Sequence, residues 1–281
     1  MEEYRSKLRT PEQIIDLIED NDYISAGQFG GCPVNLFEHL HKNKAKNVTL
    51  QTSYIMGDYP FLHQDCGLWY EAWFYGPNER ALHKEHKTTY TPAHFSQCVS
   101  KVLTRTKPRM FWGVSAPMDK HGNFNIAYGI AYEMDMLEEA DIVVLEVNEH
   151  APRTLGENTV NIRKVDYFVE AHNEPWATDP VPSLELDKLI GRNVAELVED
   201  RSVIQLGIGA IPDAVAANFT DKKDLGVHTE MITDSMAMLS EAGVITNRYK
   251  QIYKNKLVGT FVFGTRNPIT KDNINDSGQH S

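Results

Sequence analysis

The segment 224–246 contains one acidic side chain whose surroundings suit chemistry. Glu230 stands alone between two aspartates, in a stretch of glycine, histidine, threonine and apolar residues. A carboxylate that is desolvated and aligned can attack an activated carbonyl carbon. The short run 225–227 before it resembles a strand, and loops at the carboxyl ends of parallel strands are where α/β proteins place functional groups. Glu230 is equally consistent with a solvated acid before a helix that Asp234 caps and Gly243 ends.

A glycine-rich turn about twenty residues upstream could bind an anion. Gly207 and Gly209 follow the strand-like run 203–206, and Pro212 stands where the next helix begins. Backbone N–H groups in such a turn, together with the positive end of the helix, form an anion site. The turn is not a dinucleotide fingerprint, because Pro212 stands near the place of the third glycine, nor a P-loop, because no Gly-Lys-Ser/Thr follows. A tight strand-to-helix turn without a ligand fits the same pattern.

The remaining chemistry-bearing side chains form no recognisable site. A zinc site would need helical spacing of the H-E-x-x-H kind and further ligands. We therefore expect no metal, and scattered core or surface roles for His83, His86, His94 and the lone pair His63 and Cys66. His228, two residues before Glu230, could line a pocket or pack beneath the loop.

The elements that must position Glu230 and the glycine turn belong to an α/β fold. Short, nearly continuous apolar runs such as 109–115 and 141–147 are typical of strands buried on both faces of a parallel sheet. Helical patterns such as 131–140 separate them, which gives a βαβ order with helices on both sides of mostly parallel sheets. Further strands are expected at 22–27 and 47–52, and further helices at 11–20 and 34–42.

The proline-rich segment 170–183 interrupts this order and is typical of a linker. We expect an N-terminal α/β domain at 1–180 and the first part of a second α/β domain at 185–264. The second domain would contain the glycine turn, Glu230 and a final strand at 256–264. Residues 265–281 are polar and aperiodic, so we expect them to form a disordered tail.

Composition excludes several classes of protein. Of 281 residues, 41% are hydrophobic and 24% are charged, as in globular soluble proteins. The net charge of −11 argues against nucleic-acid binding, which depends on Lys and Arg. No apolar run approaches the roughly 20 residues that span a bilayer. The three cysteines show no C-x-x-C spacing and the N-terminus has no targeting signal, so we expect a cytoplasmic protein.

Three stretches share their pattern with one protein family. The longest is VIQLGIGAIPDAVAANFTDKKDLGVHTEMITDSMAMLSEAGVITN, which starts at Val203. SAPMDKHGNFN at 115–125 and ADIVVLEVNEHAPRTLGENTVNI at 140–162 agree with it. Together they resemble the family I CoA-transferases, in the branch of acetyl-CoA hydrolase/transferase and 4-hydroxybutyrate CoA-transferase. The resemblance covers residues 5–265 in order, and the glycine turn and the H-T-E-M stretch are its most specific parts.

The resemblance implies an activity and roles for particular residues. It implies two CoA-transferase-type α/β domains that move CoA between an acyl-CoA and a small carboxylate through a glutamyl-CoA thioester, with no metal or tightly bound cofactor. We also expect a homo-oligomer or a complementing chain. The glutamate of the family's H-S/T-E-M motif is the nucleophile, which here is Glu230. The G-I-G-x-I turn is associated with coenzyme A, which here implicates Gly207, Ile208, Gly209, Ala210 and Ile211.

The chain departs from the family pattern in two respects. Members of the family continue for about another domain beyond the strand at 256–264 and carry a second glycine-rich segment there. We therefore expect a chain that is truncated at its C-terminus, with an incomplete second domain. Asn161 stands where many members have histidine. Two alternatives to a CoA-transferase stay open: an acyl-CoA hydrolase on the same fold, and a non-catalytic chain that binds CoA or a partner.

Overall fold

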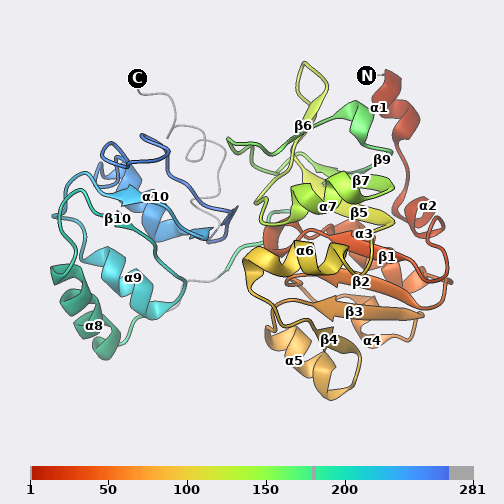
Figure 1. Cartoon of the computed structure of the whole chain (residues 1–281), viewed down its shortest axis with the longest axis horizontal. Helices are drawn as coiled ribbons and strands as arrows, with labels where there is room; N and C mark the ends of the chain where they lie inside the picture. The colour runs from red at the N-terminus through yellow and green to blue at the C-terminus, as the bar shows by residue number, and fades with distance from the viewer. Residues whose placement is uncertain (1, 179–181, 266–281) are drawn as a thin grey trace. The chain divides into compact units, whose positions relative to one another are not determined.

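The computed structural model describes residues 2–178 and 182–265 of the chain (Figure 1). The chain divides into two compact units. Unit 1 comprises Met1–Ala151 and Gly156–Pro175, and unit 2 comprises Pro152–Leu155 and Trp176–Ser281.

A seven-stranded parallel sheet forms the centre of the described part of unit 1. The strand order is β4-β3-β2-β1-β5-β7-β9, and each adjacent pair is parallel. The chain builds outward from β1 to β4 and then in the other direction from β5, so the winding reverses between β1 and β5. The strands are β1 (Tyr23–Ala26), β2 (Val48–Thr52), β3 (Leu68–Ala72), β4 (Thr88–Tyr90), β5 (Met110–Ser115), β7 (Ile142–Asn148) and β9 (Tyr167–Ala171).

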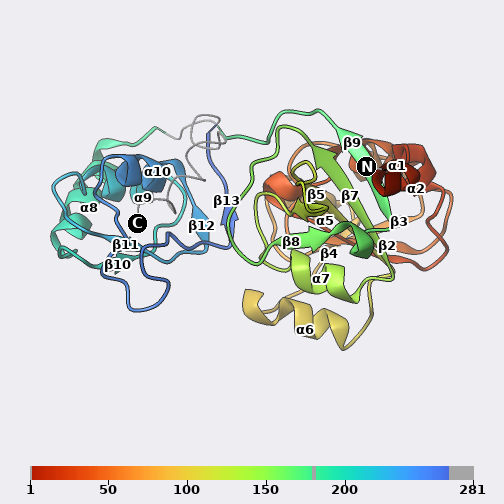
Figure 2. The ribbon, with the colours of Figure 1, turned by 90° about the horizontal axis from the view of Figure 1, so that it is seen from above.

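Helices cover both faces of this sheet. Figures 1 and 2 show α6 and α7 on one face, where Val102 and Met136 join a buried cluster with Phe111 and Leu145. On the other face lies α3, whose Leu36 N–H meets the Glu146 carboxyl group of β7. The helices are α1 (Glu2–Lys7), α2 (Pro11–Ile15), α3 (Val34–His39), α4 (Pro60–His63), α5 (Pro77–Lys84), α6 (Cys98–Leu103) and α7 (Glu133–Glu139). Four 3-10 turns (Phe29–Gly31, Leu40–Lys42, Phe95–Gln97 and Ile162–Lys164) and an antiparallel pair, β6 (Asn123–Asn125) with β8 (Thr159–Asn161), complete the described elements of unit 1.

The α/β class and the mostly parallel sheet expected from the sequence are confirmed. Strands β1, β2 and β5 form inside the predicted apolar runs, and β7 ends one residue beyond its run, at Asn148. β1 and β5 are buried throughout, as strands covered on both faces must be. The helix expected at 11–20 is shorter, because α2 ends at Ile15. After it the chain tightens into i→i+3 hydrogen bonds, from Leu17 to Ile14 and from Ile18 to Ile15.

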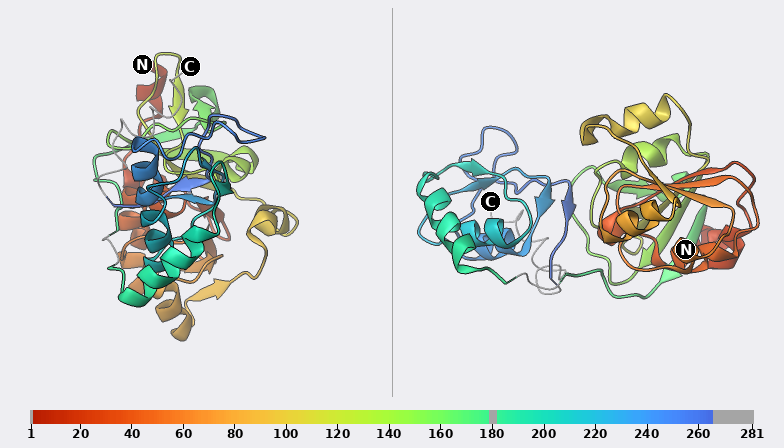
Figure 3. Two further views of the ribbon diagram at one scale, coloured as in Figure 1. Left: turned by 90° about the vertical axis from the view of Figure 1, so that its left-hand side faces the viewer. Right: turned by 90° about the horizontal axis from the view of Figure 1, so that it is seen from below.

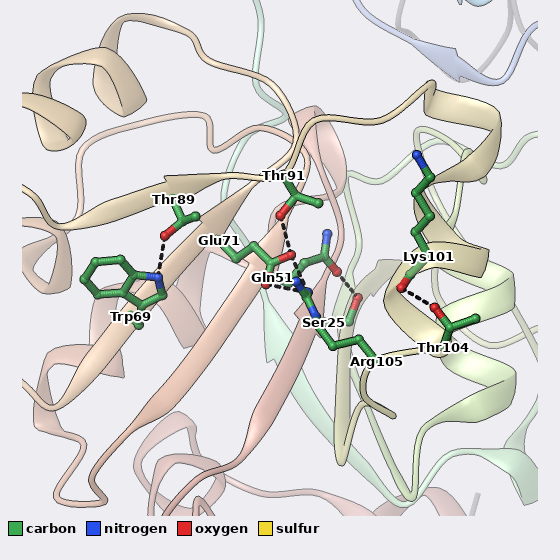
Figure 4. A network of polar contacts seen from close by, with 9 residues as sticks. All are labelled: Ser25, Gln51, Trp69, Glu71, Thr89, Thr91, Lys101, Thr104 and Arg105. Atoms are coloured by element: carbon green, nitrogen blue, oxygen red, sulfur yellow. Dashed lines mark hydrogen bonds and ion pairs between the residues drawn. The ribbon is translucent and has the colours of Figure 1, made fainter.

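Polar side chains form a row across the sheet face that α6 covers (Figure 4). Ser25, Gln51 and Glu71 are in register on β1, β2 and β3. The Ser25 hydroxyl donates to Gln51 Oε1 over 2.7 Å, and Arg105 Nη2 donates to both Glu71 oxygens over 2.7 and 2.8 Å. Glu71 is buried, whereas the Arg105 side chain is half exposed. The ion pair therefore supplies the buried carboxylate with a partner that solvent can still reach.

The described part of unit 2 holds two short parallel strand pairs and three helices. β10 pairs with β11, and β12 pairs with β13. Helices α8 and α9 lie side by side (Figure 3), so close that a Cβ on Gly191 would come within 2.6 Å of the Ala214 carbonyl group. The elements are α8 (Glu185–Glu196), β10 (Val203–Ile204), α9 (Ala210–Ala217), β11 (Gly226–Val227), β12 (Met231–Ile232), α10 (Asp234–Glu241) and β13 (Phe261–Val262).

The final strand expected at 256–264 is shorter than predicted, because this segment changes its pairing partner. Val258 forms an isolated bridge with His228, just after β11, and Phe261 then pairs with Met231 of β12. The domain limits expected from the sequence stay a prediction. The tail expected at 265–281 lies, apart from Thr265, outside the described residues.

Glu133 and Glu146 are two buried carboxyl groups of unit 1 that form no ion pair with another described residue. Burial raises the pKa of Glu146 to about 8, although the N–H groups of Leu36 and Asn35 act in the opposite direction. Burial likewise raises the pKa of Glu133 to about 7, against N–H groups that include that of Tyr132. Both groups are therefore protonated in the folded chain over a pH range in which exposed glutamates are ionised.

These two groups predict that unit 1 loses stability as the pH rises. In the unfolded chain a glutamate loses its proton near its ordinary pKa of 4.5, whereas folded Glu146 keeps its proton up to about pH 8. Unfolding then releases protons between these values, so the free energy of unfolding falls, by a few kcal/mol at most, between about pH 5 and 8. Glu146→Gln keeps an oxygen that can accept from the Leu36 N–H but has no carboxyl group to ionise. The part of the fall in unfolding free energy that Glu146 causes should therefore disappear in this variant.

Urea unfolding at a series of pH values measures the effect. The exposed Glu139→Gln of α7 is the control and should follow the wild-type curve. A pH dependence that Glu146→Gln leaves unchanged would show that Glu146 is ionised in the folded state.

Candidate active site

The two segments predicted to carry chemistry meet at one end of the β10–β11 pair. The strands are parallel, with Val203 opposite Gly226 and Ile204 opposite Val227, so their following loops leave the same edge. The His228 N–H donates to the Ile204 carbonyl group over 3.1 Å. The glycine turn and the Glu230 loop are therefore neighbours, although about twenty residues separate them in the chain.

Thr229 connects these two loops directly. It is buried, and its hydroxyl lies 3.3 Å from the Leu206 carbonyl oxygen and 3.2 Å from that of Met231. Leu206 immediately precedes the glycine turn, so the residue next to Glu230 is hydrogen-bonded to the base of that turn. The threonine of the H-T-E-M stretch thus has a structural role that the sequence did not reveal.

The backbone of Glu230 is held firmly while its side chain is exposed. Its carbonyl oxygen accepts from the Thr260 N–H over 2.8 Å, the Thr260 hydroxyl over 2.6 Å and the Phe261 N–H over 3.3 Å. Its carboxylate makes no hydrogen bond or ion pair with another described residue. The side chain is therefore not committed to a structural ion pair, and its oxygens are accessible to a substrate.

Asp234 does not cap its helix as the sequence suggested. α10 begins at Asp234 itself, with Thr233 in the capping position, so the Asp234 carboxylate lies inside the first turn. Its Oδ2 accepts instead from the Thr265 N–H over 2.8 Å. The expected end of the helix is confirmed, because Gly243 follows the last turn with a φ of +74°.

The glycine turn has the geometry of a helix start with a free N-terminal end. Gly209 has φ 115° and ψ 178°, a region open essentially only to glycine. It stands in the capping position of α9 but has no side chain to cap the helix. Pro212 contributes no N–H, so an anion at this end would meet the N–H groups of Ala210 and Ile211.

Apolar and aromatic side chains surround the two loops. Ile208 and Ile211 flank the turn with 57% and 42% of their surfaces exposed. His228 is exposed rather than packed beneath its loop, and its ring meets that of Tyr253 edge-on, with centroids 5.9 Å apart. Such a surface suits a ligand that combines an anionic group with apolar parts.

The other candidates from the sequence do not gather into a site. Across residues 2–178 and 182–265, no group of three or more His, Cys, Asp or Glu side chains could hold a metal ion. Asn161 lies in unit 1, where its amide donates to Asn123. Cys32 and Cys98 are buried free thiols, and Cys66 is half-buried. In the same described ranges no helix combines the length and apolar character needed to cross a membrane.

Comparison with known protein families and curated proteins gives consistent matches. The profile of the acetyl-CoA hydrolase/transferase N-terminal domain matches residues 1–180. The chain is 35% identical over 269 residues to the 4-hydroxybutyrate coenzyme A transferase of Clostridium kluyveri, covering 94% of this chain and 62% of that protein. It is 31% identical over 290 residues to the butyryl-CoA:acetate CoA-transferase of Anaerostipes caccae, covering 98% and 64%. The chain thus spans a little under two thirds of the length of these relatives.

Solved structures show the same fold over almost the whole chain. RipA from Yersinia pestis matches with a TM-score of 0.91 and 27% identity, over 98% of this chain and 67% of that one. A 4-hydroxybutyrate CoA-transferase from Porphyromonas gingivalis matches with a TM-score of 0.81 and 25% identity, over 98% and 66%.

The two glycines of the turn are expected to respond differently to an added methyl group. Gly209→Ala places a side chain at a φ of 115°, which costs about 1–3 kcal/mol although no atom lies within 4 Å of the new Cβ. Gly207→Ala meets only Pro212 Cγ at an ordinary 3.7 Å and should be close to neutral. Native-state hydrogen exchange of α9 measures both variants, and equal destabilisation would contradict the backbone argument.

Proposed function

Because the chain belongs to the acetyl-CoA hydrolase/transferase family, we propose that it transfers coenzyme A between an acyl-CoA and a small carboxylate. One observation carries the proposal. The loop that holds Glu230, whose carboxylate has no structural partner, and the turn at Gly209, where α9 starts without a side-chain cap, follow neighbouring strands at the same edge of the sheet. A nucleophile and an anion-binding turn are the two parts that this reaction needs at one place.

The reaction begins with attack of the Glu230 carboxylate on the thioester carbonyl carbon. The C–S bond breaks, which gives a mixed acyl-glutamyl anhydride and the CoA thiolate. The thiolate then attacks the glutamyl carbonyl carbon, and the original acid leaves as a carboxylate. The chain now carries a glutamyl-CoA thioester, and an acceptor carboxylate reverses the two steps to leave as a new acyl-CoA. One thioester replaces another, so the sequence of steps is balanced without ATP.

The residues of the site would contribute binding, alignment and charge stabilisation. The Thr260 and Phe261 contacts to the Glu230 carbonyl group fix the backbone that carries the nucleophile. N–H groups at the start of α9 would bind a negatively charged part of the CoA substrate, consistent with roles for Gly207, Ile208, Gly209, Ala210 and Ile211. The carboxylate is exposed in the free chain, so its desolvation would come with the bound substrate.

The relatives support a short-chain acid as the acyl group. Their names specify 4-hydroxybutyrate, and butyrate with acetate. We propose the same class of substrate here, with coenzyme A as a substrate rather than a bound cofactor. Assembly as a homo-oligomer or with a complementing chain, and a cytoplasmic location, stay predictions. An acyl-CoA hydrolase is the second candidate, because exposure of Glu230 leaves room for water to attack the anhydride.

The nucleophile assignment predicts a covalent adduct at Glu230. A preparation that transfers CoA, incubated with butyryl-CoA alone, should gain the mass of CoA less one water. Hydroxylamine should release the CoA and leave a hydroxamate at Glu230, which peptide mass spectrometry locates. Glu230→Gln keeps the side-chain volume but removes the anionic nucleophile, so the fold should survive while adduct and transfer are lost.

The exposed Glu241→Gln, at the end of α10, is a matched control that should form the adduct normally. Transfer by Glu230→Gln at the wild-type rate, or a CoA adduct at another residue, would show that Glu230 is not the nucleophile.

The choice between transferase and hydrolase depends on the acceptor. A transferase should release little free thiol from butyryl-CoA alone and should form acetyl-CoA once acetate is added. A hydrolase should release free CoA at a rate that acetate does not change. Thiol titration with chromatography of the acyl-CoA products distinguishes the two.

A further inference from the structure

The loop 247–256 carries a buried lysine with no carboxylate partner among the described residues. Only 4% of Lys250 is exposed. Its Nζ donates to the Val227 carbonyl oxygen over 2.7 Å and to the Lys256 carbonyl oxygen over 2.7 Å. Burial lowers the pKa of its ammonium group. A buried ammonium group needs strong acceptors, and here they are both backbone carbonyl groups.

These contacts hold the end of β11 from the side opposite β10. The Val227 carbonyl group meets Lys250, and the Val227 N–H donates to Asn247 Oδ1 over 2.8 Å. The Val227 carbonyl group also accepts from the Val258 N–H over 3.3 Å, so two side chains and one backbone group bind Val227 on this side. Val227 is the last residue of β11, and Glu230 follows three residues later.

The same ammonium group also ties the loop internally. Its contact with Lys256 joins the middle of the loop to its last residue, while the Asn255 N–H donates to the Asn247 carbonyl oxygen over 3.0 Å and joins the two ends. Asn247, Tyr253 and Asn255 in this loop all adopt positive φ. Such conformations are uncommon outside glycine and persist only where surrounding contacts enforce them. Tyr253 in this loop meets the ring of His228, so the loop contributes one wall beside the Glu230 segment.

The space around Lys250 is built for this side chain. A Cβ on Gly226 would lie 2.7 Å from Lys250 Cγ and 3.2 Å from its Cδ. The methylene stem therefore packs directly over β11, and its ammonium group reaches the end of the strand. A solvated surface lysine would have neither the packed stem nor the buried acceptor at Val227.

We propose that Lys250 is a positioning residue for the CoA-transfer site: it fixes the carboxyl end of β11 and the loop 247–256 so that Glu230 is aligned for attack. This inference rests on the proposed function of Glu230. Lys250 does not touch the substrate. It acts through Val227 on His228 and Thr229, the two residues that lead to the nucleophile.

The test compares Lys250→Met with Lys254→Met in the whole chain. Both changes remove one positive charge from the same loop, but Lys254 is exposed and makes none of these contacts. The first readout is single-turnover formation of the Glu230–CoA adduct from butyryl-CoA. The second is hydrogen exchange of the His228 and Thr229 amides, which donate to Ile204 and Val258.

Lys250→Met is expected to lower the rate constant of adduct formation at least tenfold and to change the KM for butyryl-CoA by less than about twofold. The same amides should exchange at least tenfold faster, whereas those of α8 should not change. Lys254→Met should match the wild type in both measurements. A purely structural lysine would lower the amplitude of the adduct, because less protein is folded, and leave the rate constant unchanged.

An unchanged rate constant in Lys250→Met overturns the proposal, even if exchange is faster. If the wild-type chain forms no adduct, the proposed function fails separately, and hydrogen exchange still decides whether Lys250 fixes this segment. Unchanged exchange at His228 and Thr229 overturns the proposal in that case.

Discussion

The parallel pairing of β10 with β11 is the constraint on which the candidate site depends. Only two residue pairs form this ladder, yet they bring the ends of both strands to one edge. An antiparallel pairing would send the glycine turn and the Glu230 loop to opposite edges. So short a ladder is weak by itself, which explains why side chains add to it. Thr229 bonds across to Leu206, and Asn247 and Lys250 bond to Val227 on the side opposite β10.

The local parts of the site could be predicted from the sequence. Gly209 marks the turn because its conformation is one that only glycine readily adopts, and Gly243 ends α10 for a similar reason. These features depend on a few adjacent residues. The role proposed for Glu230 came from a resemblance to a family, since its neighbours alone suited an ordinary surface acid equally well.

The contacts between distant segments could not be predicted in this way. Lys250 stands in a polar stretch and gives no sign that it is buried, because the acceptor carbonyl at Val227 lies 23 residues away. Asp234 looked like a helix cap, but its carboxylate bonds the backbone at Thr265. In unit 1, the glutamate in the apolar run of β7 is accommodated because it accepts from the start of α3, 110 residues earlier. Each case is a tertiary contact that overrides a local preference.

The close crossing of α8 and α9 limits which sequences this site can tolerate. Gly191 lies far from Glu230 in the chain, yet any side chain there would press on the Ala214 carbonyl group of α9. The helix could relieve that pressure only by shifting along or away from α8, and its first residues would move with it. Because Gly191 has no Cβ, α9 can pack this closely against α8, and this packing helps to set the direction in which the N–H groups of Ala210 and Ile211 point. During divergence of such proteins, a change at that position would shift the start of α9 without replacing any residue of the glycine turn.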